Sequence, residues 1–374
     1  MKKKYDICII SFSDLRFDAR TLNLYNMCKK MNLKVLIIYA SYDQKYILKH
    51  SDEDNHIYFM KENKRMIYNW FFFIKYIKKI IKHLSFKTLW AADLYSLVSL
   101  KFIKNKSNKN IIYDSREIYS ALSTLSNYQI KQTIITRIER KYIKFVLQLV
   151  VSGELDADYM RKFYKLNIPI HIIYNYPLYK EKINSSLIRD KFNIPTDKII
   201  LVYQGVILKG RGILPVIKAI ASNTKYVLVV LGDGNYKKEL INYCNENQLN
   251  GKVYFCGNIP YQDLHDWTCS GDIGLCNIEP ISQSYYFALP NKLFEYFQAG
   301  LPVLVTDLPA LSKLVKLHNV GEIISKDNNA DEIISALTQL TDNYQYYKKN
   351  IDKISNCYHY ESQFNLIKDI INIS

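Results

Sequence analysis

The sequence lacks paired cysteines, spaced histidines and long apolar runs, and each absence excludes a class of protein. Its seven cysteines are scattered, odd in number and without a C-x-x-C pair, so they fit free thiols in a reducing compartment better than disulfides or a metal site. Its seven histidines show no ligand spacing such as H-x3-H. No run approaches the roughly 18 apolar residues of a membrane-spanning helix. We therefore expect a cytoplasmic protein without metal or cofactor, bound at most to the inner face of the cell membrane.

Acidic residues are scarce relative to basic ones. The chain contains 51 Lys and Arg against 35 Asp and Glu, which gives a net charge of +16. This excess favours an anionic partner such as nucleic acid, an anionic membrane surface or a phosphorylated substrate. No recognised nucleic-acid motif accompanies the charge, so we expect no nucleic-acid partner.

What is present is a repeated alternation of strands and helices. Short β-branched runs alternate with segments of helical spacing in both halves of the chain, which predicts an α/β fold with parallel sheets covered on both faces. Asn175 and Pro177 mark a turn or linker between the halves. We therefore expect two facing Rossmann-like, doubly wound domains that bind ligands at the carboxyl ends of their strands. The expected strands are 5–12, 34–40, 110–115 and 145–153 in the first half, and 198–205, 225–234, 252–258, 273–278 and 302–306 in the second.

The most informative stretch is PNKLFEYFQAGLPVLV, residues 290–305. Asn291 can cap a helix that Gly300 ends in a left-handed conformation, and a buried strand follows. Lys292 and Glu295 are about one helical turn apart and point together toward one surface. They form either a solvated salt bridge or part of a binding site.

Several motifs in a fixed order give the chain a resemblance to a known family. QGVILKGRG at 204–212 and LGDG at 231–234 precede the 290–305 stretch, and a helical tail returns after it. With these motifs the chain resembles a family-4 glycosyltransferase of GT-B fold. FDARTLNLYNMCKKMNLKVLII at 17–38 and IIYDSREIY at 111–119 resemble a bacterial branch that builds capsule, lipopolysaccharide or other cell-surface glycans.

The resemblance implies an organisation and an activity. An N-terminal acceptor-side domain would span 1–177, a nucleotide-sugar-binding domain 178–355, and a C-terminal helix at 356–374 would pack back on the N-terminal domain. The implied enzyme is a glycosyltransferase of the hexosyltransferase type that uses a UDP- or GDP-sugar, with retention and without metal. Its acceptor would be a glycan or lipid-linked glycan of the bacterial surface.

The resemblance also assigns roles to residues. Glu295 would bind the ribose hydroxyls of the donor, and Lys292 its diphosphate at the N-terminus of the same helix. Arg211, six positions after Gly205, would neutralise the β-phosphate as the sugar–phosphate bond breaks. The predicted catalytic residues are Arg211, Lys292 and Arg116; the donor-binding residues are Gly205, Arg211, Ser284, Asn291, Lys292, Leu293 and Glu295; the acceptor-side residues are Asp18, Arg20 and Arg116.

Three positions depart from the family pattern. Val206 stands where the family often has Arg, and Phe287 where a Glu normally contacts the donor sugar. Arg116 stands where relatives commonly have His, and it would either bind an anion or pair with Glu117 or Asp114. These departures keep a second hypothesis open, in which the protein is a non-catalytic GT-B-fold subunit that binds a partner glycosyltransferase or a glycan.

Two further groups of charged residues have simpler alternatives. Asp18 and Arg20 follow the first strand, so they either face the ligand site or only cap and charge the next helix. Asp156 and Asp158 imitate a metal-binding D-x-D, but their position at the start of a helix favours acids that stabilise the helix N-terminus.

One segment of the first half predicts contact with an anionic membrane surface. Residues 63–84 place six apolar side chains on one helical face, with Lys75, Lys79 and Lys82 on its flank. The alternative is a helix that only covers the N-terminal sheet. The six apolar residues are Ile67, Trp70, Ile74, Ile77, Ile81 and Leu84.

Overall fold

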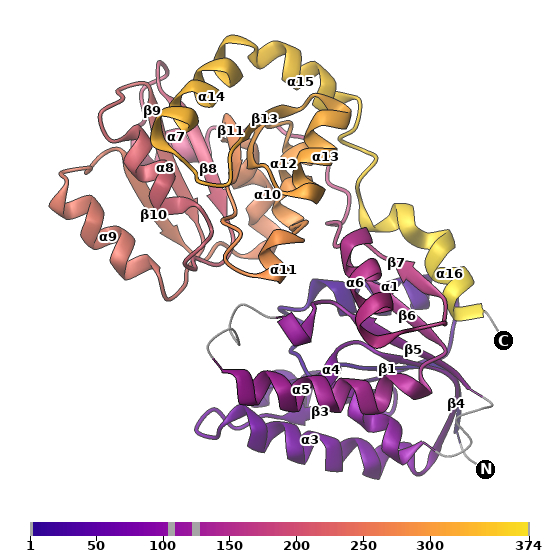
Figure 1. Ribbon diagram of the computed structural model, residues 1–374. Helices are drawn as coiled ribbons and strands as arrows, with labels where there is room; N and C mark the ends of the chain where they lie inside the picture. Colours follow the sequence, from indigo (N-terminus) through magenta and orange to yellow (C-terminus); the bar gives the residue numbers. More distant parts are fainter. Residues whose placement is uncertain (1–2, 104–108, 122–127, 373–374) are drawn as a thin grey trace. The chain divides into compact units, whose positions relative to one another are not determined.

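The computed structural model describes residues 3–103, 109–121 and 128–372 (Figure 1). The chain divides into two compact units, which we call unit 1 (Met1–Asn175 with Tyr360–Ser374) and unit 2 (Tyr176–His359). The boundaries predicted from the sequence, after residues 177 and 355, differ from these by no more than four residues.

Each unit contains one sheet whose strands are all parallel. The strands are β1 (Lys3–Ile10), β2 (Val35–Ser41), β3 (Asn55–Phe59), β4 (Leu84–Ala91), β5 (Asn110–Ser115), β6 (Gln148–Val151), β7 (Ile170–Ile172), β8 (Ile199–Gln204), β9 (Tyr226–Leu231), β10 (Val253–Gly257), β11 (Ile273–Cys276), β12 (Val303–Thr306) and β13 (Gly321–Ile324). Their order is β3-β2-β1-β4-β5-β6-β7 in unit 1 and β10-β9-β8-β11-β12-β13 in unit 2. In both sheets the winding direction reverses beside the first strand, which confirms two Rossmann-like doubly wound domains.

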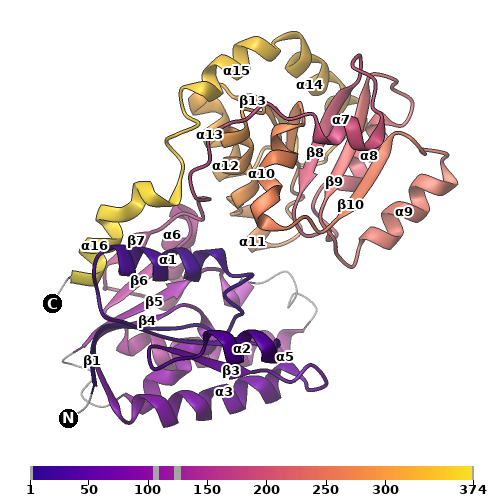
Figure 2. The same cartoon turned by 180° about the vertical axis from the view of Figure 1, so that it is seen from behind.

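Helices cover both faces of each sheet, and Figure 2 shows them from the opposite side. The helices of unit 1 are α1 (Ala19–Lys30), α2 (Gln44–His50), α3 (Met66–Ile81), α4 (Leu94–Leu97), α5 (Gln129–Tyr142), α6 (Glu154–Tyr164) and α16 (Phe364–Asn372). Those of unit 2 are α7 (Leu187–Phe192), α8 (Ile213–Ile220), α9 (Lys237–Glu246), α10 (Tyr261–Cys269), α11 (Gln283–Tyr286), α12 (Asn291–Ala299), α13 (Pro309–His318), α14 (Ala330–Asp342) and α15 (Tyr344–Asp352).

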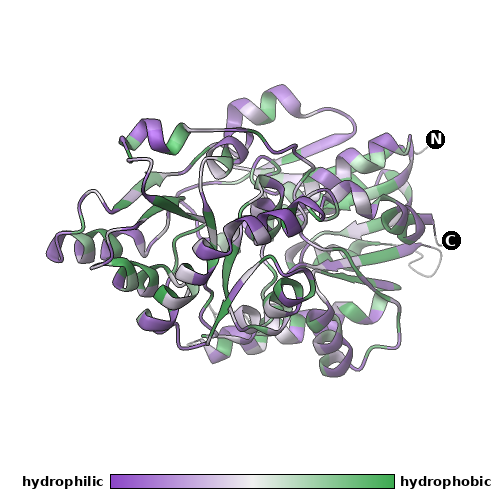
Figure 3. Ribbon diagram, turned by 90° about the horizontal axis from the view of Figure 1, so that it is seen from above, coloured by the Kyte–Doolittle hydropathy of each residue, from purple (hydrophilic) through white to green (hydrophobic). Residues whose placement is uncertain are grey.

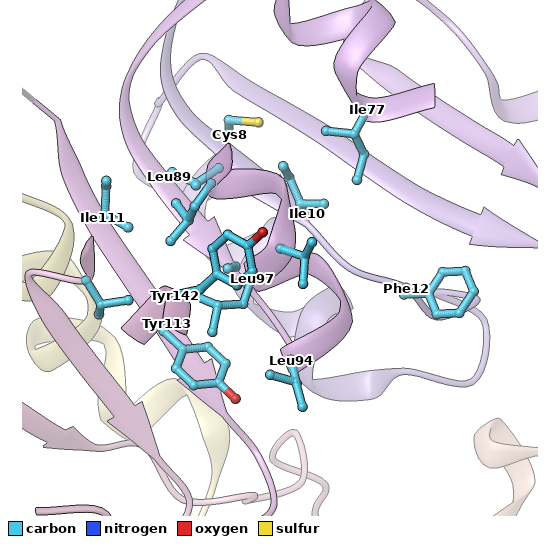
Figure 4. Packing of buried hydrophobic residues seen from close by; sticks show 14 of the residues in the cluster. Cys8, Ile10, Phe12, Ile77, Leu89, Leu94, Leu97, Ile111, Tyr113 and Tyr142 are labelled. Atoms are coloured by element: carbon cyan, nitrogen blue, oxygen red, sulfur yellow. The ribbon is translucent and has the colours of Figure 1, made fainter. Parts of the chain in front are cut away.

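Successive side chains of each strand enter different cores, because a strand points alternate residues to opposite faces. In β1, Cys8 and Ile10 join a cluster with α3, α4 and α5, part of which Figure 4 shows. Ile7 and Ile9 join the cluster with α1 and α16 on the other face. The strands are accordingly mostly hydrophobic, whereas the helices mix hydrophobic and hydrophilic residues (Figure 3).

The C-terminal helix returns to unit 1 as predicted. Ile367 and Ile370 of α16 are fully buried in the second cluster of that unit. The side-chain amides of Asn110 and Gln148 each donate to the carbonyl oxygen of Ile370 at 3.0 Å. These contacts connect the end of the chain to β5 and β6.

Four strands were not expected from the sequence, namely β3, β4, β7 and β13. The most consequential is β4, because it pairs with β1 and β5 in the centre of the sheet. It begins only three residues after the last residue of α3, so the helical pattern of that segment runs into it and obscures the strand.

The structure also corrects the predicted membrane face of α3. The helix ends at Ile81, so Leu84 lies in β4 instead. Ile74, Ile77 and Ile81 are buried in the core of unit 1, so this face covers the sheet. Across the described residues, no helix is long and apolar enough to cross a bilayer. The exposed apolar side chains of α3 are Met66, Ile67, Phe71 and Phe72.

Candidate functional site

The carboxyl end of β8 is the centre of the candidate site in unit 2. β8 lies between β9 and β11, where the winding direction of the sheet reverses, and ligands of such sheets bind at this point. Gly205 follows the strand with φ +120°, a conformation that favours glycine. A Cβ atom at Gly232 would come within 2.0 Å of the Gly205 carbonyl oxygen. Both glycines therefore let two loops approach closely above the strand ends.

Lys292 lies beside this turn, on the first turn of α12. Its side chain is buried, with Nζ 3.6 Å from the centroid of the Tyr203 ring and about 4.0 Å from where a Cβ of Gly205 would lie. Within residues 3–103, 109–121 and 128–372, no hydrogen-bond partner reaches Nζ. Burial, with some repulsion from Arg211, lowers the pKa of Lys292 to about 7, although Cys276 and Glu295 oppose the shift. An anion at this position would restore the full charge.

Arg211 approaches from the loop before α8. Its Cζ lies 4.5 Å from the centroid of the Tyr285 ring, and its Nε is buried without a hydrogen-bond partner in the described part of the chain. Gly212 follows with φ +70°, and a Cβ there would come within 1.7 Å of the carbonyl oxygen of Asn277. The side-chain amide of Asn277, just after β11, is buried and equally unpartnered among the described residues. Lys292, Arg211 and Asn277 each thus keep a buried hydrogen-bond donor that no described residue uses.

Glu295 projects from the same helix as Lys292. Its Oε2 accepts a hydrogen bond from Nε2 of Gln204, whose Oε1 lies 2.7 Å from Oγ1 of Thr268. Burial raises the pKa of Glu295, while the Gln204 hydrogen bond and the charge of Lys292 act in the opposite direction. Glu295 lines a pocket of about 270 Å³, partly open to solvent, together with Lys180 and His265 among others.

The remaining predicted donor-binding residues lie in the same unit but differ in access. Asn291 is exposed at the first position of α12, and Pro290 takes the cap position, so the predicted Asn291 cap is wrong. Leu293 is fully buried, and its amide donates to the Pro290 carbonyl at 3.1 Å. Ser284 lies in α11 with its hydroxyl 3.2 Å from that of Ser282.

The predicted acceptor-side residues form a separate group in unit 1, at the carboxyl ends of β1 and β5. Nη1 of Arg116 lies 2.7 Å from Oδ2 of Asp18, and its Nη2 donates to the hydroxyl of Thr21. Burial alone would raise the pKa of Asp18, but Arg116 and hydrogen bonds from Ser13 and Thr21 lower it to about 2. Arg116 is therefore paired with Asp18, an acid that the sequence analysis did not name as its partner.

Arg20 is paired as well. It contacts both carboxylate oxygens of Asp114, with the shortest distance 2.8 Å, and donates to the carbonyl oxygen of Ile173. Asp18 meanwhile accepts from the backbone N–H of Thr21 and so caps α1. Asp18 thus has the capping role that the sequence left as an alternative, whereas the pairing of Arg20 with Asp114 was not expected. Both lie at the strand edge where ligands of such sheets bind.

Four buried polar residues beside these groups were missed by the sequence analysis. In unit 2 they are Gln204, Thr268 and Asn277. In unit 1, Asp93 accepts from the backbone N–H of Phe12 at 2.7 Å. For Gln204 and Asn277 the available signal was positional, since they are polar residues directly at the end of expected apolar strands, whereas Asp93 follows β4, which was not expected.

Of the two acids at the start of α6, only Asp156 lies in the first turn, whereas Oδ1 of Asp158 is 3.9 Å from Nη1 of Arg161. The carboxylate of Asp156 accepts from Ser152 at 3.3 Å at this helix N-terminus, but burial raises the pKa of Asp156 to about 6. In the part of the chain that the structure describes, no three His, Cys, Asp or Glu side chains are grouped to hold a metal ion.

Comparisons with known proteins give a family for unit 2. Residues 184–356 match the family described as Glycosyl transferases group 1. The O-antigen biosynthesis glycosyltransferase WclY of Escherichia coli is 29% identical over 136 residues, 34% of this chain and 33% of that protein. TuaC of Bacillus subtilis, whose name assigns it to teichuronic acid biosynthesis as a glycosyltransferase, is 25% identical over 153 residues, 41% of this chain and 35% of that protein. Each match thus spans about a third of the relative.

A solved structure extends the likeness to both units. HepE of Anabaena, solved in complex with UDP and glucose, has a TM-score of 0.75 at 12% identity and covers 99% of this chain and 100% of that chain. At so low an identity the likeness concerns the fold, which is that of GT-B glycosyltransferases.

Proposed function

Because residues 184–356 match the family of glycosyl transferases group 1, we propose that the protein transfers a sugar from a nucleotide-sugar donor to a bacterial surface-glycan acceptor. The observation that carries the proposal is that three of the unpartnered buried groups of unit 2 lie around the candidate site, namely Lys292 Nζ, Arg211 Nε and the Asn277 amide. Each such group costs about 1–3 kcal/mol when left unpaired. The oxygens of a bound diphosphate would remove that cost.

In the proposed reaction the bond between the anomeric carbon and the β-phosphate oxygen breaks, and negative charge grows on the diphosphate. Arg211, Lys292 and the free N–H groups at the start of α12 stabilise this charge in place of a metal. The acceptor hydroxyl attacks the anomeric carbon from the side that the phosphate leaves and gives its proton to the departing phosphate oxygen. The products are the glycosylated acceptor, with retained configuration, and a nucleoside diphosphate.

The proposed donor is a UDP- or GDP-hexose whose ribose hydroxyls bind Glu295. The buried carboxylate of Glu295 beside an open pocket supports this assignment, because a sheltered charge-assisted hydrogen bond is worth about 1.5–3 kcal/mol. The UDP and glucose bound to HepE favour the uridine nucleotide. The names of WclY and TuaC support an acceptor that belongs to a surface glycan.

The proposed acceptor is lipid-linked, and unit 1 would meet it on an anionic bilayer through α3. Unit 1 contains 32 Lys and Arg against 17 Asp and Glu, a net charge of +15, whereas unit 2 contains 19 against 18, a net charge of +1. Met66, Ile67, Phe71 and Phe72 are exposed on α3, and the ammonium of Lys75 lies 4.4 Å from the centroid of the Phe71 ring. Apolar side chains edged by lysine suit an anionic headgroup region.

The test is release of nucleoside diphosphate by the purified protein from a panel of UDP- and GDP-sugars with a lipid-linked acceptor. Turnover with at least one donor is expected. No turnover combined with no binding of UDP or GDP would overturn the proposal. If the protein then recovered a glycosyltransferase in a pull-down, the non-catalytic subunit suggested by Val206, Phe287 and Arg116 would replace it.

A further inference from the structure

We propose that Gln204 and Thr268 are positioning residues that orient the carboxylate of Glu295 for the donor nucleotide. The proposal rests on the proposed function, because it takes the ribose as the ligand of Glu295. The three residues come from three different elements, β8, α10 and α12. Gln204 and Thr268 border the same pocket as Glu295, but each is only 1% exposed, so their main contact with the site is through Glu295.

The three side chains form a continuous chain of hydrogen bonds. Oγ1 of Thr268 lies 2.7 Å from Oε1 of Gln204, and Nε2 of Gln204 donates to Oε2 of Glu295. The backbone N–H of Gln204 donates to the hydroxyl of Tyr296 at 3.1 Å, which joins β8 to the residue next to Glu295. Both the main chain and the side chain of Gln204 are thus bound to α12.

The single hydroxyl proton of Thr268 decides which way the Gln204 amide points. Oγ1 also lies 2.7 Å from the Leu264 carbonyl oxygen, so two acceptors compete for one proton. If the proton went to Leu264, the Gln204 oxygen would face either the lone pairs of Thr268 or, after an amide flip, the ionised carboxylate of Glu295. Donation from Thr268 to Gln204 avoids both repulsive pairs, and it aims the amide N–H at Glu295.

This arrangement leaves Oε1 as the carboxylate oxygen of Glu295 that can accept ribose hydroxyls. It also favours the ionised form, because a hydrogen bond donated to a carboxylate stabilises its charge. The other five residues of β8 are Ile, Ile, Leu, Val and Tyr, so an apolar residue at 204 would suit the core as well. A buried amide at this position is therefore explained by what it does to Glu295 rather than by packing.

The test compares affinities for UDP and for 2′,3′-dideoxy-UDP by calorimetry, or for the matching guanosine pair if the wild type prefers GDP. The wild type should favour the ribonucleotide by about 10–100-fold, which one or two charge-assisted hydrogen bonds provide. Gln204→Met should reduce this preference to within about 3-fold of that in Glu295→Ala. Thr268→Val should reduce it by a smaller factor, and Thr268→Ser, which keeps the hydroxyl, should retain the wild-type preference.

Affinity for the dideoxy nucleotide is the internal control. It should stay constant in all variants, because Lys292 and Arg211 are untouched, whereas a misfolded variant would lose it. An unchanged ribose preference in Gln204→Met, or a wild type that binds UDP without any ribose preference, overturns the positioning role and leaves the proposed function in place. A wild type that binds neither UDP nor GDP overturns both.

Discussion

The two units carry charged side chains at equivalent edges of similar sheets, but the charges are paired in one unit and unpaired in the other. In unit 1 the Asp18–Arg116 and Arg20–Asp114 pairs are closed at 2.7 and 2.8 Å. In unit 2, Lys292 Nζ and Arg211 Nε are buried and have no hydrogen-bond partner in the described chain. Each of these charges in unit 1 has a counter-charge within the unit, although Nε of Arg116 is also buried without a hydrogen-bond partner among the described residues. In unit 2 we propose that an anion supplies the missing counter-charge.

The largest effect is expected from breaking a pair in unit 1. Asp18→Asn keeps the cap of α1 but leaves Arg116 without its counter-charge, which should lower the free energy of unfolding of unit 1 by about 3–5 kcal/mol. Hydrogen exchange should become faster in β1 and β5 and stay unchanged in β8 and β11. Lys292→Met is the matched control, because it removes a buried charge that has no partner, and it should not accelerate exchange in unit 2. If Asp18→Asn and Lys292→Met accelerated hydrogen exchange equally in their own units, the proposed difference between paired and unpaired charges would be wrong.

The second largest effect is expected on kcat, when an unpaired cation of unit 2 is removed. Arg211→Ala should lower kcat by about 100–1000-fold, since the charge that Arg211 meets develops in the transition state. Affinity for the nucleoside diphosphate should fall by less than about 10-fold. Glu295→Ala should instead weaken donor use by about 10–100-fold through KM. If both variants left kcat and KM unchanged in a donor titration, the site would lie elsewhere.

Local features of the site could be predicted from the sequence. The pairing of its charged side chains could not, because that pairing depends on residues that only the tertiary structure brings together. The left-handed end of α12 at Gly300 follows from a local capping rule, and the structure has φ +73° there, whereas the predicted cap at its start was wrong. That Arg116 pairs with Asp18 depends on the carboxyl ends of β1 and β5 meeting across an unexpected strand, β4, between them. Nothing local in the sequence reveals such a pairing.

The same limit explains the error at α3. Helical periodicity correctly places Ile74, Ile77 and Ile81 on one face, but periodicity is identical for a face that meets a sheet and one that meets a bilayer. The hydrogen bonds that connect Thr268, Gln204 and Glu295 could not be predicted from the sequence for a related reason. Thr268 and Glu295 are 64 and 91 residues from Gln204 along the sequence, so only the fold brings the three side chains together.

Membrane binding tests whether the charge difference between the units has a function. Changing Lys75, Lys79 and Lys82 together to Glu should abolish flotation with anionic liposomes at low salt, because each lysine near the surface contributes about 1 kcal/mol. High salt should release the wild type. The matched control changes Lys238, Lys316 and Lys349, which are exposed on unit 2, and it should float like the wild type. If both triple variants lose flotation equally, net charge alone drives the binding. A wild type that ignores anionic liposomes would mean that α3 only covers the sheet.

The smallest expected effect is a proton that accompanies nucleotide binding. Burial holds the pKa of Lys292 at about 7, below its ordinary 10.5, so at pH 8 the amine is mostly neutral in the free protein. A diphosphate favours the ammonium form, so binding at pH 8 should take up about one proton and affinity should fall as pH rises above 7. Without ligand the sign for stability is opposite. The unfolded chain binds the extra proton between pH 7 and 10.5, so the stability of unit 2 should rise across that range.

Calorimetry of UDP or GDP binding in two buffers of different ionisation enthalpy measures this proton directly. Lys292→Arg keeps the positive charge but cannot lose it near neutral pH, so it should bind the nucleotide with no proton uptake. Uptake in the wild type that disappears in Lys292→Arg would identify the buried amine as the group that the anion recharges. A wild type that takes up no proton would mean that Lys292 is already charged before the anion arrives, and that its charge, like those of unit 1, is satisfied within the protein.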